Sequence, residues 1–230
     1  TLVRKYAHKY NIVIYSRDEN KHWLMKQEFK EYTNIKWTLG CIRDKENVEI
    51  SIFKYKPSIV IIASALKHID QCENNISECI NTNIIGIKNI IDVIYLNSFK
   101  DKIPYLEKVL FVSTDKACSP VNSYGMCKSL SERIVIEKSE YIMKPKFVVV
   151  RYGNVINSRG SILPLFKKIG ENVNNSHFTI THFDMTRFFM TLEQSVRLIE
   201  EAIINGDSGD IVIPKLVSCN IKDLLELFSE

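Results

Sequence analysis

Short apolar stretches rich in Val and Ile alternate with helix-forming stretches along almost the whole chain, and this alternation limits the possible folds more than any other feature. The stretches of strand length are residues 11–15, 35–39, 58–63, 107–112, 146–152 and 210–213. The helices expected around them are residues 2–10, 19–32, 45–55, 77–96, 122–132, 192–205 and 221–228. Strands that alternate with helices form βαβ units, whose strands run parallel. The sequence therefore predicts an α/β fold with a doubly wound parallel sheet.

Composition excludes several classes of function. The 230 residues, 45% hydrophobic and 25% charged, suffice for one large core. The net charge is only +4 and Lys is mixed with Asp and Glu, so no basic stripe for nucleic acid is expected. The six cysteines show neither a C-x-x-C pair nor zinc spacing, which indicates reduced thiols, a cytoplasmic location and no metal. The longest apolar run, residues 58–66, is too short to span a bilayer.

The strand at residues 107–112 ends in a cluster of reactive side chains. Ser113, Thr114, Asp115 and Lys116 follow it directly. Open parallel sheets bind ligands at the carboxyl ends of their strands. Hydroxyl, carboxylate and amine groups at such an end supply a hydrogen-bond donor, an acid and a base together. The sequence therefore predicts an active site there.

Tyr124 and Lys128 follow this cluster and are four residues apart, on one face of the next helix. A Lys cation close to a phenol favours the phenolate and lowers the Tyr pKa, which makes Tyr a usable general base. The Tyr-x3-Lys spacing alone also fits an ordinary surface turn of helix. Its position after the reactive strand end favours the functional interpretation.

A dinucleotide-binding sheet normally begins with a strand and a glycine-rich turn that admits the pyrophosphate. Here no glycine precedes Gly40, and Thr1 falls inside what should be the helix after that turn. We expect that the first strand and glycine loop are missing from the chain shown. The alternative is a domain that never bound a dinucleotide.

The end of the strand at residues 11–15 bears on the choice of cofactor. Ser16 and Arg17 stand where NAD-binding proteins carry an acidic residue for the ribose 2′-hydroxyl. A hydroxyl and a guanidinium suit a 2′-phosphate, so NADP is favoured over NAD. Arg17 fits equally well as a charged neighbour of a helix cap.

Several short blocks stand in a characteristic order along the chain. They are Ser16-Arg-Asp-Glu19, Ala63-Ser-Ala-Leu-Lys-His68, Asn81-Thr-Asn83 with Gly86, Ser113-Thr-Asp-Lys-Ala117, Tyr124-x3-Lys128, Arg151-Tyr-Gly-Asn-Val155 with Ser158-Arg-Gly-Ser161, and Asp184-Met-Thr-Arg187. In this order the chain resembles the inverting UDP-N-acetylglucosamine 4,6-dehydratases, which are Rossmann-like extended short-chain dehydrogenases of polysaccharide biosynthesis. The nine-residue step from Asp115 to Tyr124 is the most diagnostic feature.

The resemblance implies a mechanism for these residues. Tyr124 would take the O4 proton of UDP-N-acetylglucosamine as hydride leaves C4 for NADP⁺, with Lys128 holding the phenolate and ribose and Thr114 bonding O4. Lys116 would then remove the C5 proton and Asp115 would protonate the departing O6. Hydride would return to C6, giving the C5-inverted product UDP-2-acetamido-2,6-dideoxy-beta-L-arabino-hex-4-ulose.

The resemblance also implies binding roles and a division of the chain. Residues 1–152 would form the NADP-binding domain, and residues 153–230 a nucleotide-sugar-binding region that interleaves with the core and is truncated at its C-terminus. The implied cofactor-binding residues are Ser16, Arg17, Ala63, Ala65, Asn83, Ser113, Tyr124 and Lys128. The implied substrate-binding residues are Lys67, Asn154, Arg159, Ser161 and Arg187. We expect a homo-oligomer.

Two of these residues also fit simpler structural interpretations, and two other functions remain compatible with the sequence. Asn83 fits equally well as an ordinary helix Asn whose amide is satisfied locally, and Arg187 as the partner of a salt bridge. The other functions are a UDP-sugar 4-epimerase, which needs Tyr124 and Lys128 but not Lys116, and a catalytically silent nucleotide-binding module.

Overall fold

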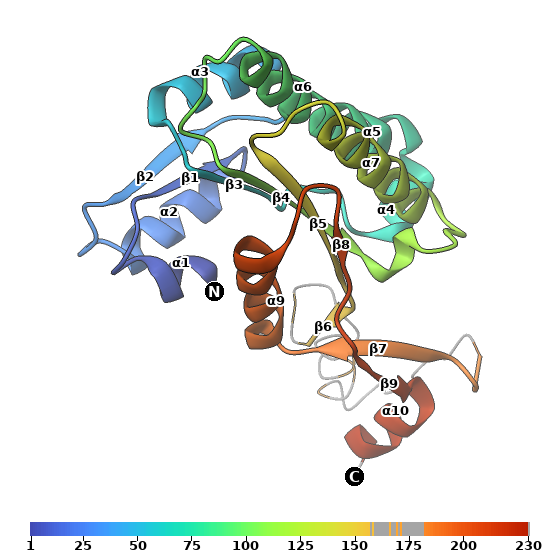
Figure 1. Ribbon diagram of the computed structural model, residues 1–230. Helices are drawn as coiled ribbons and strands as arrows, with labels where there is room; N and C mark the ends of the chain where they lie inside the picture. Colours follow the sequence, from blue (N-terminus) through green and yellow to red (C-terminus); the bar gives the residue numbers. More distant parts are fainter. Residues whose placement is uncertain (157, 159–165, 167–168, 170, 172–181, 230) are drawn as a thin grey trace.

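Parallel strands with helices on both faces make up most of the structure, a computed structural model that describes residues 1–156, 158, 166, 169, 171 and 182–229 (Figure 1). β1 (Ile12–Ser16) pairs with β2 (Ile35–Leu39). A second sheet has the order β3 (Ile59–Ile62), β4 (Lys108–Thr114), β5 (Lys146–Tyr152) and β8 (Ile211–Val212), and all its pairs are parallel. The predicted α/β class is confirmed.

The helices cover the strands from two sides (Figure 1). One side carries α3 (Lys45–Tyr55), α4 (Ile69–Asn74), α5 (Ile76–Ile80), α6 (Gly86–Phe99) and α7 (Ser123–Ser139). The other side carries α1 (Leu2–Tyr6), α2 (Glu19–Glu28) and α9 (Leu192–Asn205). The expected helices are therefore present, although α1 ends earlier than expected and α4 was not expected.

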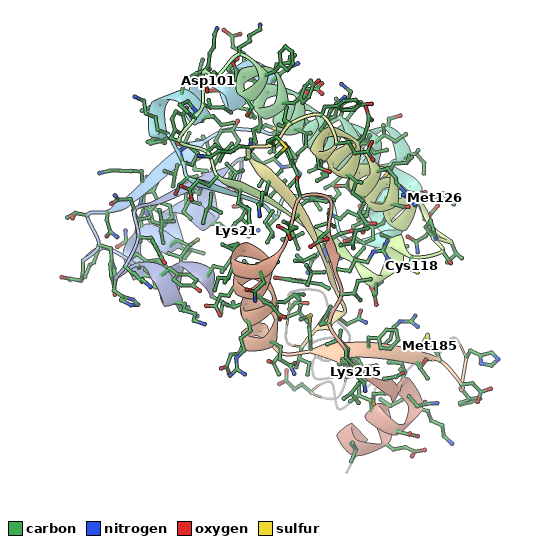
Figure 2. All side chains as sticks on the ribbon, viewed as in Figure 1. Lys21, Asp101, Cys118, Met126, Met185 and Lys215 are labelled. Atoms are coloured by element: carbon green, nitrogen blue, oxygen red, sulfur yellow. The ribbon has the colours of Figure 1, made fainter. Side chains whose placement is uncertain are left out.

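The core follows from the two-residue period of the strands, whose alternate side chains point to opposite faces. In β4, Val109 and Phe111 are fully buried and pack in one cluster with apolar residues of α3, α6 and α7. Leu110, between them, packs in a second cluster with Leu198 and Ile199 of α9. Side chains accordingly fill both layers between strands and helices (Figure 2). This explains why β4 is apolar at consecutive positions.

The structure differs from the expected single sheet, because β1 and β3 are not hydrogen-bonded to each other within the described residues. In the doubly wound order 3-2-1-4-5-6, the first strand stands between the second and the fourth. Ile59 and Ile61, on the same face of β3, are 39% and 37% exposed, so this face of the strand is incompletely covered in the described residues. A first strand with a glycine loop stays a prediction.

A small mixed sheet that the sequence did not predict follows β5. β6 (Asn154–Val155) pairs in parallel with β7 (Thr186–Met190), and β7 pairs antiparallel with β9 (Val217–Asn220). α10 (Ile221–Ser229) follows β9 directly. The predicted boundary between residues 1–152 and 153–230 stays a prediction.

The helix expected over residues 77–96 is a composite. α5 and α6 are joined by a π-helical turn, Asn81–Ile85. By length and composition the whole segment Ile76–Phe99 is one helix that could cross a membrane, and half of its apolar window is buried inside the protein. Ile87, Ile91 and Ile94 are fully buried against the sheet, so packing in the core accounts for their apolar character. The predicted absence of a membrane span stays a prediction.

Candidate active site

A cavity of about 540 Å³ opens at the carboxyl ends of β4 and β5. It lies where parallel sheets bind ligands. The predicted site residues that line it are Ala63, Ala65, Lys67, Ser113, Thr114, Lys116, Tyr124, Lys128, Asn154 and Arg187. His68, Asp70 and Tyr152 also line it, although the sequence analysis assigned no role to them. The structure thus brings predicted cofactor, substrate and catalytic residues into one space.

Other predicted site residues lie elsewhere. Arg17 is exposed and Ser16 half-buried at the end of β1, and neither lines this cavity. Ser16 Oγ instead accepts a hydrogen bond from the Asp18 backbone at 3.1 Å. Arg159 and Ser161 lie outside the described residues.

Asn83 is completely buried and does not line the cavity, in contrast to its expected contact with the cofactor. Its Oδ1 accepts from the Leu66 backbone N–H and its Nδ2 donates to the Leu66 carbonyl, both at 2.8 Å. Asn83 therefore fixes the loop that carries Ala65 and Lys67. It organises the site from behind the lining residues.

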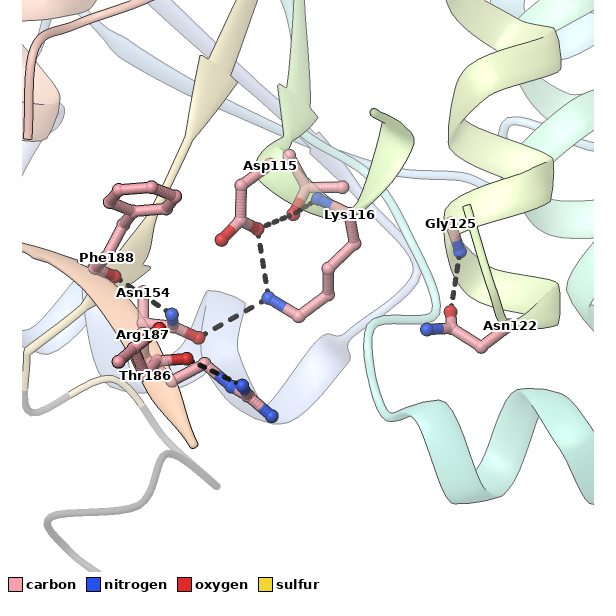
Figure 3. A network of polar contacts seen from close by, with 9 residues as sticks. Asp115, Lys116, Asn122, Gly125, Asn154, Thr186, Arg187 and Phe188 are labelled. Atoms are coloured by element: carbon pink, nitrogen blue, oxygen red, sulfur yellow. Dashed lines mark hydrogen bonds and ion pairs between the residues drawn. The ribbon is translucent and has the colours of Figure 1, made fainter. Parts of the chain in front are cut away.

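A chain of polar contacts crosses the cavity at the end of β4 (Figure 3). Thr114 Oγ1 donates to Asp115 Oδ1 at 2.9 Å, and Lys116 Nζ donates to the same oxygen at 3.0 Å. Lys116 Nζ also lies 3.4 Å from Asn154 Oδ1. Asn154 Nδ2 in turn donates to the Phe188 carbonyl of β7 at 2.9 Å. Asp115 and Lys116, adjacent in sequence, thus form an ion pair beside the cavity.

The start of α7 is fixed by local sequence. Asn122 is the N-cap, and its Oδ1 accepts from the Gly125 backbone N–H at 2.8 Å (Figure 3). A Cβ on Gly125 would lie 2.3 Å from the Lys116 backbone carbonyl oxygen, so only glycine allows this approach. The helix that carries Tyr124 therefore packs directly on the turn that carries Lys116.

Tyr124 does not show the lowered pKa that the sequence predicted. Burial is the main cause that raises the pKa of Tyr124 to about 12. A hydrogen bond with Thr114 works against this shift, and the nearby Asp115 carboxylate adds to it. The prediction failed because the spacing of Tyr124 and Lys128 specifies a shared helix face but not the depth at which that face is buried.

Lys128 is 3% exposed, and its ammonium is held against β4. Its Nζ donates to the Val112 carbonyl at 2.6 Å and lies 4.0 Å from the centre of the Phe111 ring. Burial lowers the pKa of Lys128 to about 7, against the opposing effect of Glu132. Lys128 is therefore poised to exchange a proton near neutral pH.

Sequence reasoning missed the ion pair beneath Lys128. Glu132 is 2% exposed, and its two carboxylate oxygens accept from Arg151 Nε at 3.0 Å and Nη2 at 2.7 Å. The pair joins α7 to β5. The available signal was spacing, because Glu132 is four residues after Lys128 and lies on the same helix face.

The hydroxyl of Ser113 bears on what the cavity binds. Ser113 Oγ is buried without a hydrogen-bond partner in the described part of the chain, and Ser113 lines the cavity. An unsatisfied buried hydroxyl can bind a polar group of a ligand.

All six cysteines are free thiols, and Cys79 Sγ lies 3.7 Å from Cys127 Sγ behind Tyr124. No group of three or more metal-ligating side chains is found within the described residues.

Several known proteins align with this chain over most of the chain's length. A protein of Methanocaldococcus jannaschii described as an uncharacterized membrane protein is 41% identical over 85% of the chain and 56% of its own length. A UDP-N-acetylglucosamine 4,6-dehydratase (inverting) of Campylobacter jejuni is 39% identical over 93% of the chain and 61% of its own length. A UDP-glucose 4-epimerase of Rickettsia bellii is 37% identical over 93% and 60%. The chain thus spans about three fifths of the length of these relatives.

A solved structure supports the same relationship. The crystal structure of Pen from Bacillus thuringiensis matches with a TM-score of 0.85 and 32% identity, over 94% of this chain and 64% of that one. The resemblance to inverting dehydratases noted in the sequence is confirmed by the relative from C. jejuni. The model of the family described as "Polysaccharide biosynthesis protein" matches residues 2–230, so the chain belongs to that family.

Proposed function

We propose that the protein containing this chain is an inverting UDP-N-acetylglucosamine 4,6-dehydratase, which removes one water molecule from its sugar. The observation that carries the proposal is the ion pair of Asp115 and Lys116, 3.0 Å apart at the end of β4 and beside Tyr124. The C. jejuni relative of that name supports it. A UDP-sugar 4-epimerase is the second candidate, because a relative carries that name, but an epimerase has no use for Lys116.

The ion pair holds the proton that an elimination needs. Loss of water between C5 and C6 requires a neutral amine to take the C5 proton and a protonated carboxyl to give a proton to O6. Transfer of one proton from Lys116 Nζ to Asp115 Oδ1 produces both forms at once. After the elimination Lys116 is again an ammonium and Asp115 again a carboxylate, so the pair returns to its starting state.

Oxidation at C4 falls to Tyr124, which lines the cavity and is hydrogen-bonded to Thr114. Tyr124, as the phenolate, would take the O4 proton and become a neutral phenol, and Lys128, on the same helix face, would stabilise the phenolate before that transfer. A bound nicotinamide dinucleotide supplies the oxidation of C4 and the reduction of C6. The positive charge of the oxidised nicotinamide would also favour the Tyr124 phenolate over the phenol.

The residues present fit such a cofactor. Ser113 offers the cavity a hydroxyl that has no partner among the described residues, and Ala63 and Ala65 line the cavity with small side chains that leave room for a ribose. We propose NADP rather than NAD, because Ser16 and Arg17 stand at the end of β1 where NAD would require an acidic residue. Affinities of the full-length protein that are equal for the two dinucleotides, or that favour NAD, would exclude this preference.

The substrate would enter from the side of β6 and β7. Arg187 and Lys67 line the cavity as cations suited to the UDP diphosphate, and Arg159 and Ser161 are proposed to join them. We also propose a cytoplasmic homo-oligomer. Met126, Leu130 and Ile76 on α7 and α5 are 50%, 55% and 43% exposed, which supports association through these helices.

Lys116→Ala tests the proposed function. The full-length variant should still oxidise C4, since Tyr124 and Thr114 remain, but the release of 4-keto-6-deoxy product should fall about 10²–10⁴-fold. Product and C5 configuration are read by NMR after reaction with UDP-N-acetylglucosamine and NADP⁺ in deuterated water. Unmodified enzyme should place deuterium at C5.

A control and two contrary outcomes complete the test. Lys138→Ala removes a lysine that is ion-paired at the far end of α7 and should leave turnover unchanged. Normal dehydration by Lys116→Ala would exclude Lys116 as the C5 base. Formation of a C4 epimer in place of the dehydrated product by unmodified enzyme would establish the epimerase instead.

A further inference from the structure

We propose that Asn154 is a positioning residue for Lys116, so that its side-chain carbonyl oxygen aims the lysine amine at the substrate. The inference rests on the proposed function, since it assigns a second residue to the elimination step. It replaces the sequence-based expectation that Asn154 binds the substrate diphosphate. Asn154, Lys116 and Phe188 are drawn together in Figure 3.

Hydrogen bonding determines the orientation of the Asn154 amide. The Phe188 carbonyl can only accept, so the atom that lies 2.9 Å from it must be Nδ2. Oδ1 therefore points the other way, toward Lys116 Nζ at 3.4 Å. The backbone of Asn154 is fixed as well, because β6 pairs with β7 with Asn154 opposite Phe189.

Lys116 needs such an external contact more than other side chains do. A lysine amine ends a flexible four-carbon stem and has no preferred plane. Its ion-pair partner Asp115 is its neighbour in sequence and moves with the same 3₁₀ turn, Asp115–Ala117. Asn154 belongs to another strand on the opposite side of the cavity. The hydrogen bond from Lys116 to Asn154 therefore fixes the position of the lysine amine relative to the other side of the cavity.

The diphosphate is matched better by Arg187 than by Asn154. Phosphate oxygens accept hydrogen bonds, and one of the two N–H groups of Asn154 Nδ2 already donates to the Phe188 carbonyl, whereas the guanidinium of Arg187 offers charge-assisted bonds. Arg187 is two residues from Phe189 in β7 and therefore lies on the same face of the strand. It brings a cation to the same side of the cavity. Recognition of the diphosphate falls to that cation, which leaves Asn154 to hold Lys116.

The experiment separates elimination from the other steps in the full-length protein with UDP-N-acetylglucosamine. Asn154→Ala should slow exchange of the C5 proton in deuterated water about 10- to 100-fold, the loss expected when a reacting group is displaced by about 1 Å. The rate of C4 oxidation in a single turnover and the KM should stay within about threefold. Asn154→Ser should show the same selective loss, and it serves if the alanine variant does not fold.

Asn220→Ala is the matched control. Asn220 lies in β9 of the same small sheet, and its Nδ2 also donates to a backbone carbonyl, that of Phe183. This variant should keep normal exchange, whereas equal loss in both would show a merely structural effect and overturn the inference. A raised KM with unchanged exchange in Asn154→Ala would restore its role in binding the diphosphate. Absence of C5 exchange in unmodified enzyme would instead overturn the proposed function itself, and the assignment of Asn154 with it.

Discussion

The two walls of the cavity are built in different ways. The inner wall, formed by the end of β4 and by α7, carries Ser113 and Lys128, each 3% exposed. The outer wall, formed by β6, β7 and the loop at residues 63–68, carries Lys67 and Arg187, and Arg187 is exposed. Ser113 and Lys128 are therefore shielded from water at the base of the inner wall, and the side chains of Asp115 and Lys116 above them are 23% and 27% exposed. The groups expected to recognise the diphosphate are exposed to solvent.

The two walls also differ in how their charged groups contribute to the stability of the fold. On the inner wall, Lys128 and Glu132 are buried and bonded to specific partners, the Val112 carbonyl and the partly buried Arg151 guanidinium. Arg187 on the outer wall remains hydrated in the folded protein, so its charge contributes little to the free energy of folding. Changes to the inner wall should accordingly affect stability or chemistry, and changes to the outer wall should affect binding.

The largest effect is expected at Tyr124. Tyr124→Phe removes the proposed base for O4 from the inner wall, so oxidation of C4 should fall about 10²–10⁴-fold. Single-turnover absorbance of the reduced nicotinamide measures this step directly. Cofactor affinity, measured by titration, should be little changed. Reduction of the cofactor at the unmodified rate would remove Tyr124 from the mechanism.

The second effect is on stability. Glu132→Gln leaves the partly buried Arg151 guanidinium, 18% exposed, without its charge partner and should lower the free energy of unfolding by about 2 kcal/mol or more. Glu137→Gln, on the same helix, removes an exposed partner of Lys138 and should change it by at most about 1 kcal/mol. Denaturant titrations give both values. Equal effects would contradict the distinction between buried and exposed pairs.

The third effect depends on pH. The pKa of Lys128 is about 7 in the folded protein, below its ordinary value of 10.5, so the unfolded chain binds more protons between these two values. Stability should therefore rise with pH across that window, by about 2 kcal/mol from about pH 7 to about pH 9. Lys128→Met should abolish this rise, whereas Lys100→Met, at an exposed position, should preserve it. A Lys128→Met protein with an unchanged pH profile would show that Lys128 is not the group responsible.

The smallest effect belongs to the outer wall. Arg187→Ala should raise the KM for the UDP-sugar about tenfold, the value of one charge-assisted contact, with kcat unchanged. The free energy of unfolding should change by no more than about 0.5 kcal/mol, because the side chain is exposed. Steady-state kinetics and a denaturant titration test the two parts. A large loss of stability would mean that the outer wall is as tightly built as the inner wall.

The sequence predicted the inner part of the fold well. The strand at residues 146–152 coincides with β5, and the cluster from Ser113 to Lys116 does lie at the end of β4. Such strands are buried on both faces, so their apolar run and their length identify them. The polar residues that follow a buried strand are then placed by topology alone.

The outer part could not be predicted in the same way. β7 carries Thr186, Arg187 and Phe188 at exposed positions, so it lacks the apolar run that marks a buried strand. The contact of Asn154 with Lys116 joins residues 38 positions apart through a small sheet that no local pattern indicates. The raised pKa of Tyr124 depends on burial depth, which residue spacing does not encode.

The π-helical turn at Asn81–Ile85 makes the site sensitive to the length of the chain behind it. A π turn contains one residue more than the α-helical turn it replaces. Deleting a single residue there would restore regular helix and rotate every residue on one side by about 100°. Asn83 would then turn away from Leu66, and the loop of Ala65 and Lys67 would lose both of its hydrogen bonds to that amide. In an alignment of related chains, gaps should therefore be tolerated in surface loops but excluded from this turn.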